Sequence, residues 1–265
     1  MGIENAEIIV VKVGTSTLTY ENGKLNLKRI EMLCRTLSDL QNSGKKIVLV
    51  SSGAIGVGVG KLGLSSKPNE TSKKQAAAAV GQCELMFIYD KFFSEYNQTV
   101  AQILLTGDVV LNENKLQNVQ NTFRELLAMN VIPIVNENDT VETAELEGSN
   151  IGDNDTLSAI VACCIDAHVL IILSDIDGLF DSNPKENPNA KIINTVENIT
   201  PEILQIAGGA GSNRGTGGMI TKIKAAKLTT EKGIFCAIAN GNDTENIYKI
   251  LNGVTIGTVF KPNKI

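Results

Sequence analysis

The sequence contains no tryptophan and one histidine, His168, which begins an apolar run. A histidine at the start of an apolar strand more often has a structural role than a catalytic one. If His168 is structural, the sequence has no other histidine that could form a Ser-His or Cys-His pair. The sequence therefore argues against nucleophilic-triad catalysis, and any reaction has to proceed without a histidine base.

Cysteines are few, odd in number and unpaired in their spacing. None of them forms a CxxC motif, and all lie inside apolar segments. This argues against a disulfide framework and against metal ligation, so we expect reduced core thiols and no protein metal site. The five residues are Cys34, Cys83, Cys163, Cys164 and Cys236.

Long hydrophobic runs are also missing. No stretch approaches the ~20 apolar residues that a membrane helix needs, and the first residues lack the basic, apolar and small-residue regions of a signal peptide. We therefore expect a cytoplasmic protein without a membrane partner. The net charge of −5, from 24 basic and 29 acidic residues, argues against a nucleic-acid partner.

Apolar segments of strand length alternate with segments of helical periodicity along the whole chain. This pattern predicts an α/β fold with a mainly parallel sheet and helices on both faces. We expect one domain over residues 1–265, whose two halves meet near Ala167. Expected strands are 7–13, 47–50, 100–105, 131–135, 169–173, 191–194, 234–239 and 257–260, and expected helices are 27–40, 72–97, 113–129, 156–167, 219–232 and 244–251, with a further helix beginning at Pro201.

Ligands of parallel sheets bind at the carboxyl ends of the strands. The most conspicuous segment at such an end is 136–159, a polar, acidic stretch rich in Asn and Asp that leads into an apolar helix. Short side chains of this kind hydrogen-bond in both directions, so we interpret the segment as a binding-site loop. Other strand ends supply Lys12 with Gly14, Ser52 with Gly53, and Ser174 with Asp175.

Two lysines stand out by their surroundings. Lys12 lies within an apolar strand, where an ammonium group needs an anionic partner unless the strand end is exposed; we favour contact with an anion. Lys222 follows a glycine-rich segment, 208–218, at the start of a helix, where free backbone amides favour phosphate. Lys224 and Lys227 are interpreted as its solvated neighbours.

Two common phosphate-binding motifs do not explain these features. The literal GxGxxG at Gly58, Gly60 and Gly63 begins eight residues after Val50, away from the tight turn that a dinucleotide site requires. The GxxxxGK[ST] pattern of P-loop enzymes is absent. Phosphoryl transfer to a carboxylate remains compatible with the lack of a histidine base, because a carboxylic acceptor (pKa about 4.3 for a glutamate side chain) is already ionised near neutral pH.

Seven motifs follow one another along about residues 10–261. They are VVKVGTST from Val10, VSSGAIGVG from Val50, QAAAAVGQ from Gln75, NENDTV from Asn136, GDNDTLSA from Gly152, LSDIDGLFDSNP from Leu173 and GTGGMITKIKAA from Gly215. Together they resemble the glutamate 5-kinases, a family of the amino acid kinase superfamily. The resemblance implies a three-layer αβα sandwich and transfer of the ATP γ-phosphate to the side-chain carboxylate of L-glutamate, giving γ-glutamyl phosphate, the first step of proline biosynthesis.

The resemblance also implies roles for individual residues. Catalytic roles fall to Lys12 and Lys222, which would neutralise the transferring phosphoryl group, and to Asp155, which would orient both lysines. Glutamate would be held by Ser52, Gly53, Asp139 and Asn154. ATP would be framed by Lys12, Gly14, Ser174, Asp175, Thr216, Gly217, Gly218, Met219 and Lys222, with Mg²⁺ carried largely by the nucleotide phosphates.

The sequence departs from the family pattern in two ways. Many relatives carry a C-terminal PUA domain, which we do not expect here, and the loop after Asp139 is a few residues longer through 147–150. The family also implies a homo-oligomer and feedback inhibition by proline. The alternatives are a sister kinase acting on another carboxylate or carbamate, a non-catalytic amino-acid sensor and, more remotely, a dehydrogenase.

Overall fold

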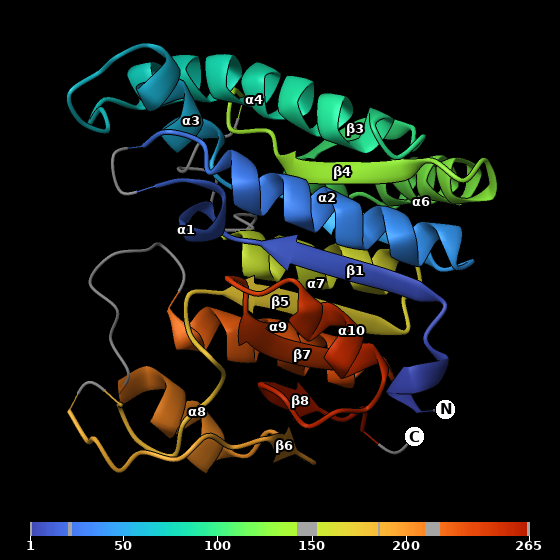
Figure 1. The fold of residues 1–265 in the computed structure, drawn as a ribbon, viewed down its shortest axis with the longest axis vertical. Coiled ribbons are helices and arrows are strands. Elements are labelled where there is room, and N and C mark those ends of the chain that lie inside the picture. Colours follow the sequence, from blue (N-terminus) through green and yellow to red (C-terminus); the bar gives the residue numbers. More distant parts are fainter. Residues whose placement is uncertain (1, 21–22, 142–152, 185, 210–217, 264–265) are drawn as a thin grey trace. The chain divides into compact units, whose positions relative to one another are not determined.

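The computed structural model describes residues 2–20, 23–141, 153–184, 186–209 and 218–263 (Figure 1). The chain divides into two compact units. The first unit comprises Met1–Lys12 together with Gly152–Ile265, and the second comprises Val13–Ile151.

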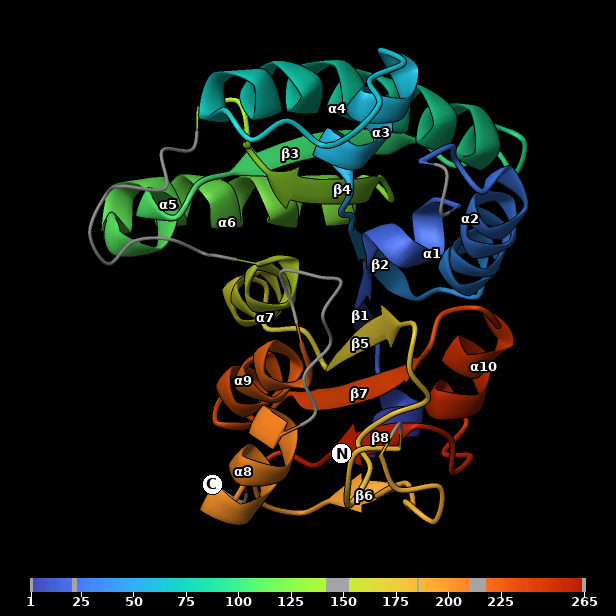
Figure 2. The same ribbon diagram turned by 90° about the vertical axis from the view of Figure 1, so that its left-hand side faces the viewer.

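The second unit contains three parallel strands in the order β3-β4-β2. Figure 2 shows helices α2 and α6 on opposite sides of these strands. Within the described residues its elements are α1 (Thr15–Leu18), α2 (Leu27–Asn42), β2 (Lys46–Val50), α3 (Ala54–Lys61), α4 (Thr71–Ser94), β3 (Val100–Leu105), α5 (Asp108–Leu111), α6 (Glu113–Ala128) and β4 (Ile132–Glu137).

The first unit orders its strands β1-β5-β7-β8-β6. Strands β5 and β7 are parallel, whereas β8 runs antiparallel to β7, and α7 and α9 lie on one face with α10 on the other (Figure 2). Its described elements are η1 (Ile3–Asn5), β1 (Ile8–Val13), α7 (Asn154–Cys164), β5 (Val169–Ser174), β6 (Thr195–Val196), α8 (Pro201–Gly209), α9 (Met219–Thr230), β7 (Phe235–Asn240), α10 (Glu245–Leu251) and β8 (Thr258–Phe260).

The fold is therefore α/β, with a mainly parallel central sheet flanked by helices, as the alternating pattern predicts. Every residue of β5 is buried, and β1 and β2 are buried after their first residue. Helices on both faces shield such strands from water, which explains why they are continuous apolar runs rather than alternating ones.

Several element boundaries differ from those expected from sequence, and four of these differences change the assignment of particular residues. Strand β4 continues through Glu137 because β3 pairs with it that far, so Asn136 lies in a strand rather than a loop. Helix α7 is 154–164 instead of 156–167, since Asp153 caps it earlier. The short strand is not 191–194 but Thr195–Val196, which pairs with β8. Gly208 belongs to the end of α8.

Helices α3 and α4 approach each other through glycines. A Cβ added to Gly58 would lie 1.8 Å from the Ala77 carbonyl oxygen, and one added to Gly81 would lie 1.8 Å from that of Ala54. A Cβ added to Gly60 would likewise lie 2.7 Å from the Gly23 carbonyl oxygen. The GxGxxG segment thus serves helix packing, which supports the exclusion of a dinucleotide site there.

The five cysteines are free thiols, but they are not all in the core. Cys34 and Cys236 are buried as expected, while Cys83 is exposed on the outward side of α4, so its assignment to the core is wrong. Burial and the nearby Asp166 carboxylate raise the pKa of the half-buried Cys164 to about 11. A thiol with a raised pKa is a poor nucleophile at neutral pH.

Candidate active site

A carboxylate and two ammonium groups meet in the interior of the first unit. Lys12 Nζ lies 2.7 Å from Asp155 Oδ1, and Lys222 Nζ lies 3.0 Å from Asp155 Oδ2. The three residues are only 7%, 1% and 6% exposed, in the order Lys12, Asp155, Lys222. The alternative in which Lys12 sits at an exposed strand end is therefore wrong, and the three residues assigned catalytic roles from sequence lie together.

Different elements deliver these three side chains. Lys12 projects from near the carboxyl end of β1, Asp155 from the first turn of α7 and Lys222 from the first turns of α9. Asp153 fixes the start of α7, because its Oδ1 accepts hydrogen bonds from the backbone N–H groups of Asp155 (2.8 Å) and Thr156 (2.9 Å). Asp153 is thus a helix cap that holds Asp155 in place.

Two opposing effects set the ionisation of Asp155. Burial raises the pKa of this carboxyl, but the ammonium groups of Lys12 and Lys222 and the hydroxyl of Thr221 together lower it by more. The net pKa lies below the ordinary value of 3.8, so Asp155 is ionised at neutral pH. An ionised carboxylate in this position holds both ammonium groups and fixes their direction.

The nucleotide residues expected from sequence are partly described. Ser174 is buried at the end of β5 and its hydroxyl donates to Asp175 Oδ1 (3.1 Å), while Asp175 itself is exposed. Gly218 is the N-cap of α9 and Met219 is its first residue. Thr216 and Gly217 lie outside the described residues, as does the longer loop at 147–150.

The end of β7, which was not among the expected site segments, lies beside Ser174 at the end of β5. Because β5 and β7 are parallel neighbours, their carboxyl ends lie side by side, and the Gly241 N–H donates to the Ser174 carbonyl oxygen at 2.7 Å. The Asn240 side chain donates to Asp177 Oδ1 at 2.8 Å. The Asn-Gly pair at 240–241, which ends the apolar run, is the sequence feature that indicates a turn at this strand end.

The residues expected to contact glutamate are divided between the units. In the second unit Ser52 is buried and Gly53 adopts φ +93°, a left-handed conformation that favours glycine, at the start of α3. Asp139 is half-buried in the turn after β4. In the first unit Asn154 is the first residue of α7. Gly14, expected at the nucleotide, precedes α1 in the second unit.

Helix α4 supports the polar strand ends of the second unit. The Tyr89 hydroxyl lies 2.9 Å from Ser51 Oγ, and both groups are buried. The Asn136 side chain donates to Gln82 Oε1 at 2.9 Å and accepts from the Glu137 N–H at 2.9 Å. Asn136 therefore has hydrogen-bond partners within the second unit.

His168 has the structural role expected from its position. Its Nδ1 accepts a hydrogen bond from the Ile8 N–H at 3.0 Å, and the His168 backbone N–H donates to the Ile8 carbonyl oxygen at 2.9 Å. Because Nδ1 is an acceptor, the neutral imidazole carries its proton on Nε2. The ring joins the beginnings of β1 and β5.

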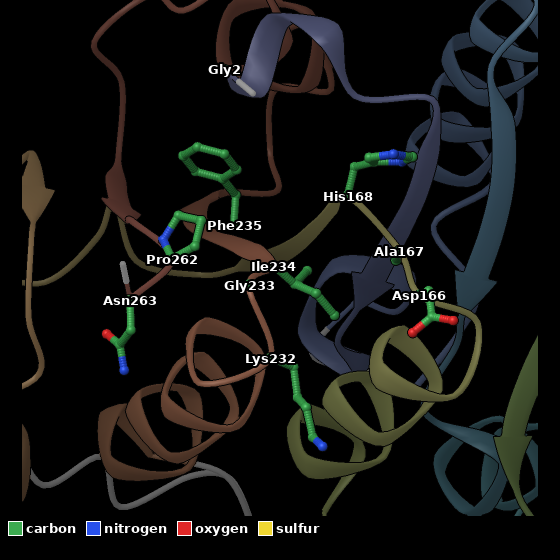
Figure 3. Close-up of a pocket in the computed structure, with 10 residues that line it drawn as sticks. All are labelled: Gly2, Asp166, Ala167, His168, Lys232, Gly233, Ile234, Phe235, Pro262 and Asn263. Atoms are coloured by element: carbon green, nitrogen blue, oxygen red, sulfur yellow. The ribbon is translucent and has the colours of Figure 1, made fainter. Parts of the chain in front are cut away.

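A separate pocket of the first unit lies at the amino ends of β5 and β7 (Figure 3). It encloses about 460 Å³ and is lined by residues preceding these strands, together with Gly2, Phe235, Pro262 and Asn263. None of the candidate catalytic, glutamate or nucleotide residues lines it. The pocket is thus distinct from the Lys12–Asp155–Lys222 cluster, which gathers around the carboxyl end of β1.

Two general properties of the described part of the chain bear on the site. Among the described residues, no group of three or more His, Cys, Asp or Glu side chains could hold a metal ion. None of the described helices is long and apolar enough to cross a membrane.

Comparison with known proteins identifies the family. The amino acid kinase family matches residues 7–240. The chain is 59% identical to the glutamate 5-kinase of Clostridium perfringens, covering 99% of this chain and 98% of that protein, and 53% identical to that of Clostridium tetani, covering 99% and 97%. A carbamate kinase from Giardia lamblia has the same fold, with a TM-score of 0.68 at 15% identity and coverage of 98% and 100%. The chain therefore belongs to the amino acid kinase family and, within it, to the glutamate 5-kinases.

Proposed function

We propose that this chain uses ATP to phosphorylate the side-chain carboxylate of L-glutamate, forming γ-glutamyl phosphate in the first step of proline biosynthesis. The observation that carries this proposal is the buried Lys12–Asp155–Lys222 cluster, in which one carboxylate holds two ammonium groups. The identity of 59% and 53% to two glutamate 5-kinases along nearly the whole chain supports this choice of substrate.

The cluster suits phosphoryl transfer because that reaction depends mainly on positioning and on stabilising charge. In our proposal Lys12 and Lys222 stabilise the negative charge on the transferring phosphoryl oxygens. Asp155 keeps the two ammonium groups at fixed positions before ATP binds, so little reorganisation is needed during the reaction. The acceptor carboxylate is already ionised near neutral pH, so no histidine base is required.

The two substrates are assigned to different parts of the chain. We propose that the N-terminal half contributes the glutamate residues Ser52, Gly53, Asp139 and Asn154, with Asp139 facing the ammonium group of the amino acid. Buried Ser52 offers a hydroxyl, and the half-buried Asp139 offers a carboxylate of the required charge.

The C-terminal half is assigned mainly to ATP. We propose that the residues framing the nucleotide are Lys12, Gly14, Ser174, Asp175, Thr216, Gly217, Gly218, Met219 and Lys222. The amide groups at the start of α9, 12 residues long, favour a phosphate. The N-terminal and C-terminal halves of residues 1–265 would then act together as one amino acid kinase domain.

Mg²⁺ is the expected cofactor, since when bound it would neutralise negative charge on the nucleotide phosphates. The one carboxylate of the cluster, Asp155, is engaged by two ammonium groups and is a poor candidate for a metal ligand. The exposed Asp175 carboxylate is the more accessible carboxylate among the proposed nucleotide residues. We further propose a homo-oligomer and inhibition by proline at the glutamate residues.

Hydroxamate trapping tests the proposed reaction directly. Purified protein with ATP, Mg²⁺ and hydroxylamine should form γ-glutamyl hydroxamate from glutamate but not the corresponding products from aspartate or N-acetylglutamate. Product from another acceptor alone would assign the chain to a sister kinase. Glutamate binding by calorimetry without ATP consumption would instead identify a sensor.

Substitution of Lys222 tests the role of the cluster. We expect Lys222→Ala to lower kcat by about 10²- to 10³-fold, the usual effect of losing one group that stabilises transition-state charge, while the KM for glutamate changes little. Lys224→Ala, which removes an exposed lysine of the same helix, is the matched control and should retain activity. Unchanged turnover in Lys222→Ala would refute the assigned role.

A further inference from the structure

Thr221 stands next to Lys222 and reaches the same carboxylate oxygen. Its hydroxyl lies 2.7 Å from Asp155 Oδ2, to which Lys222 Nζ also donates at 3.0 Å. Neighbouring residues of a helix point in different directions. Convergence of Thr221 and Lys222 on one oxygen is therefore a specific arrangement of the first turn of α9.

The hydroxyl has a second acceptor within reach. Thr221 Oγ1 lies 2.8 Å from the carbonyl oxygen of Gly218, the N-cap of α9, while the Thr221 N–H reaches the same carbonyl at 3.3 Å. A hydroxyl carries one proton and can donate fully to one acceptor at a time. An ionised carboxylate is the stronger acceptor, so the proton points to Asp155.

The bonds to Asp155 together define the plane of its carboxylate. Lys12 engages Oδ1, while Lys222 and Thr221 engage Oδ2. The two lysine ammonium groups are carried on long, flexible chains, whereas Thr221 is short and its β-branched side chain is stiff at χ1. Thr221 is therefore the donor best suited to fix where Oδ2 lies.

We propose that Thr221 is a positioning residue for phosphoryl transfer, whose hydroxyl holds the Asp155 carboxylate in the orientation that directs Lys12 and Lys222. The inference rests on the proposed function of this cluster. Thr221 touches neither reacting group in this scheme. It acts through Asp155, so its loss should affect the transfer step more than the binding of glutamate.

The test compares three variants in the hydroxamate assay. Thr221→Val keeps the shape but removes the hydroxyl, and Thr221→Ser keeps the hydroxyl. Thr229→Val removes a buried hydroxyl of the same helix that lies within hydrogen-bond distance of the Ala225 and Ala226 carbonyl oxygens. Misplacing a group that stabilises the transition state can cost up to about 100-fold in rate, so a loss of about 10- to 100-fold is the scale expected for a positioning residue.

We expect kcat of Thr221→Val to fall by about that factor, with the KM for glutamate unchanged. Thr221→Ser should recover most of the turnover, and Thr229→Val should behave like the original protein. A Thr221→Val enzyme of normal kcat, or a Ser variant no better than Val, would overturn the inference. If the original protein itself forms no hydroxamate, the proposed function fails instead.

A second measurement is independent of activity. The titratable groups facing Asp155 in the described part of the chain are Lys12 from β1, Lys222 from α9 and Cys236 from β7. A hydroxyl donor stabilises the ionised carboxylate more than the protonated carboxyl. The stability difference between the original protein and Thr221→Val should therefore be fully present at pH 7 and should shrink as pH falls below the ordinary pKa of 3.8, through the lower folded pKa of Asp155. The corresponding difference for Thr229→Val should not change. A pH-independent difference for Thr221→Val would contradict the proposed bond.

Discussion

Substitution of Gly81 by alanine should destabilise the second unit and disturb the residues proposed to bind glutamate. A Cβ at this position would lie 1.8 Å from the Ala54 carbonyl oxygen, 2.5 Å from the Gly58 nitrogen and 2.9 Å from the Ala54 carbonyl carbon. All three atoms belong to the backbone of α3. No side-chain rotation can relieve the overlap, so α3 and α4 have to move apart.

The magnitude follows from two opposing contributions. Overpacking costs about 1–3 kcal/mol, and a backbone overlap this close belongs at the upper end, about 3 kcal/mol. Alanine gains about 1 kcal/mol over glycine in a helix interior, which leaves a net loss of about 2 kcal/mol. For a protein of this size each kcal/mol lowers Tm by about 2–4 °C, so a decrease of about 4–8 °C is expected.

The functional effect should fall on glutamate rather than on transfer. Ala54 directly follows Ser52 and Gly53, the residues proposed at the amino acid, so displacement of α3 moves that turn. Thermal unfolding measures the stability, and the hydroxamate assay at 20 °C separates KM from kcat. We expect a raised KM for glutamate with a much smaller change in kcat.

Gly208→Ala is the matched control. Gly208 also lies in a helix, α8, but an added Cβ there would meet no atom of the described residues within 4 Å. Its Tm should stay the same or rise slightly. A Gly81→Ala protein with unchanged Tm would show that the two helices do not require glycine contact, and a change in kcat alone would refute the link between α3 and glutamate.

Two further predictions concern Asp155 and His168. Asp155→Asn should cost about 3 kcal/mol at pH 7, because it leaves buried ammonium groups without their ionised partner. The pKa of Asp155 in the folded protein is depressed, so this stabilisation is complete above the ordinary pKa of 3.8 and is lost as pH falls through the lower folded value. Denaturant unfolding between pH 7 and 3 should therefore show the stability difference between the original protein and Asp155→Asn narrowing below about pH 4. His168→Ala removes the acceptor of the Ile8 N–H and should cost about 1–3 kcal/mol, with kcat unaffected; a large fall in kcat would assign His168 a catalytic role.

Local patterns in the sequence predicted most of the fold. Alternating strands and helices gave the α/β class, and β3 was placed with its observed bounds. Errors arose where partners outside the segment decide the outcome. Pairing with β3 draws Asn136 into β4, and pairing with β8 places the short strand at Thr195–Val196. The exposure of Cys83 depends on which side of α4 other elements cover, and the local sequence does not contain this information.

The sequence by itself determined which charged residues stand in unusual surroundings. Lys12 lies in an apolar strand and Lys222 follows a glycine-rich segment, and burial of an ammonium group requires an anionic partner. Only the tertiary structure decided that one carboxylate serves both, since Asp155 is 67 residues from Lys222 along the chain and meets it through the packing of α7 and α9. The same packing brings Thr221 to Asp155, a contact that no periodicity or motif in the sequence reveals. Hydrophobic patterns specify the individual helices and strands, whereas the topology of the fold specifies which of their ends meet.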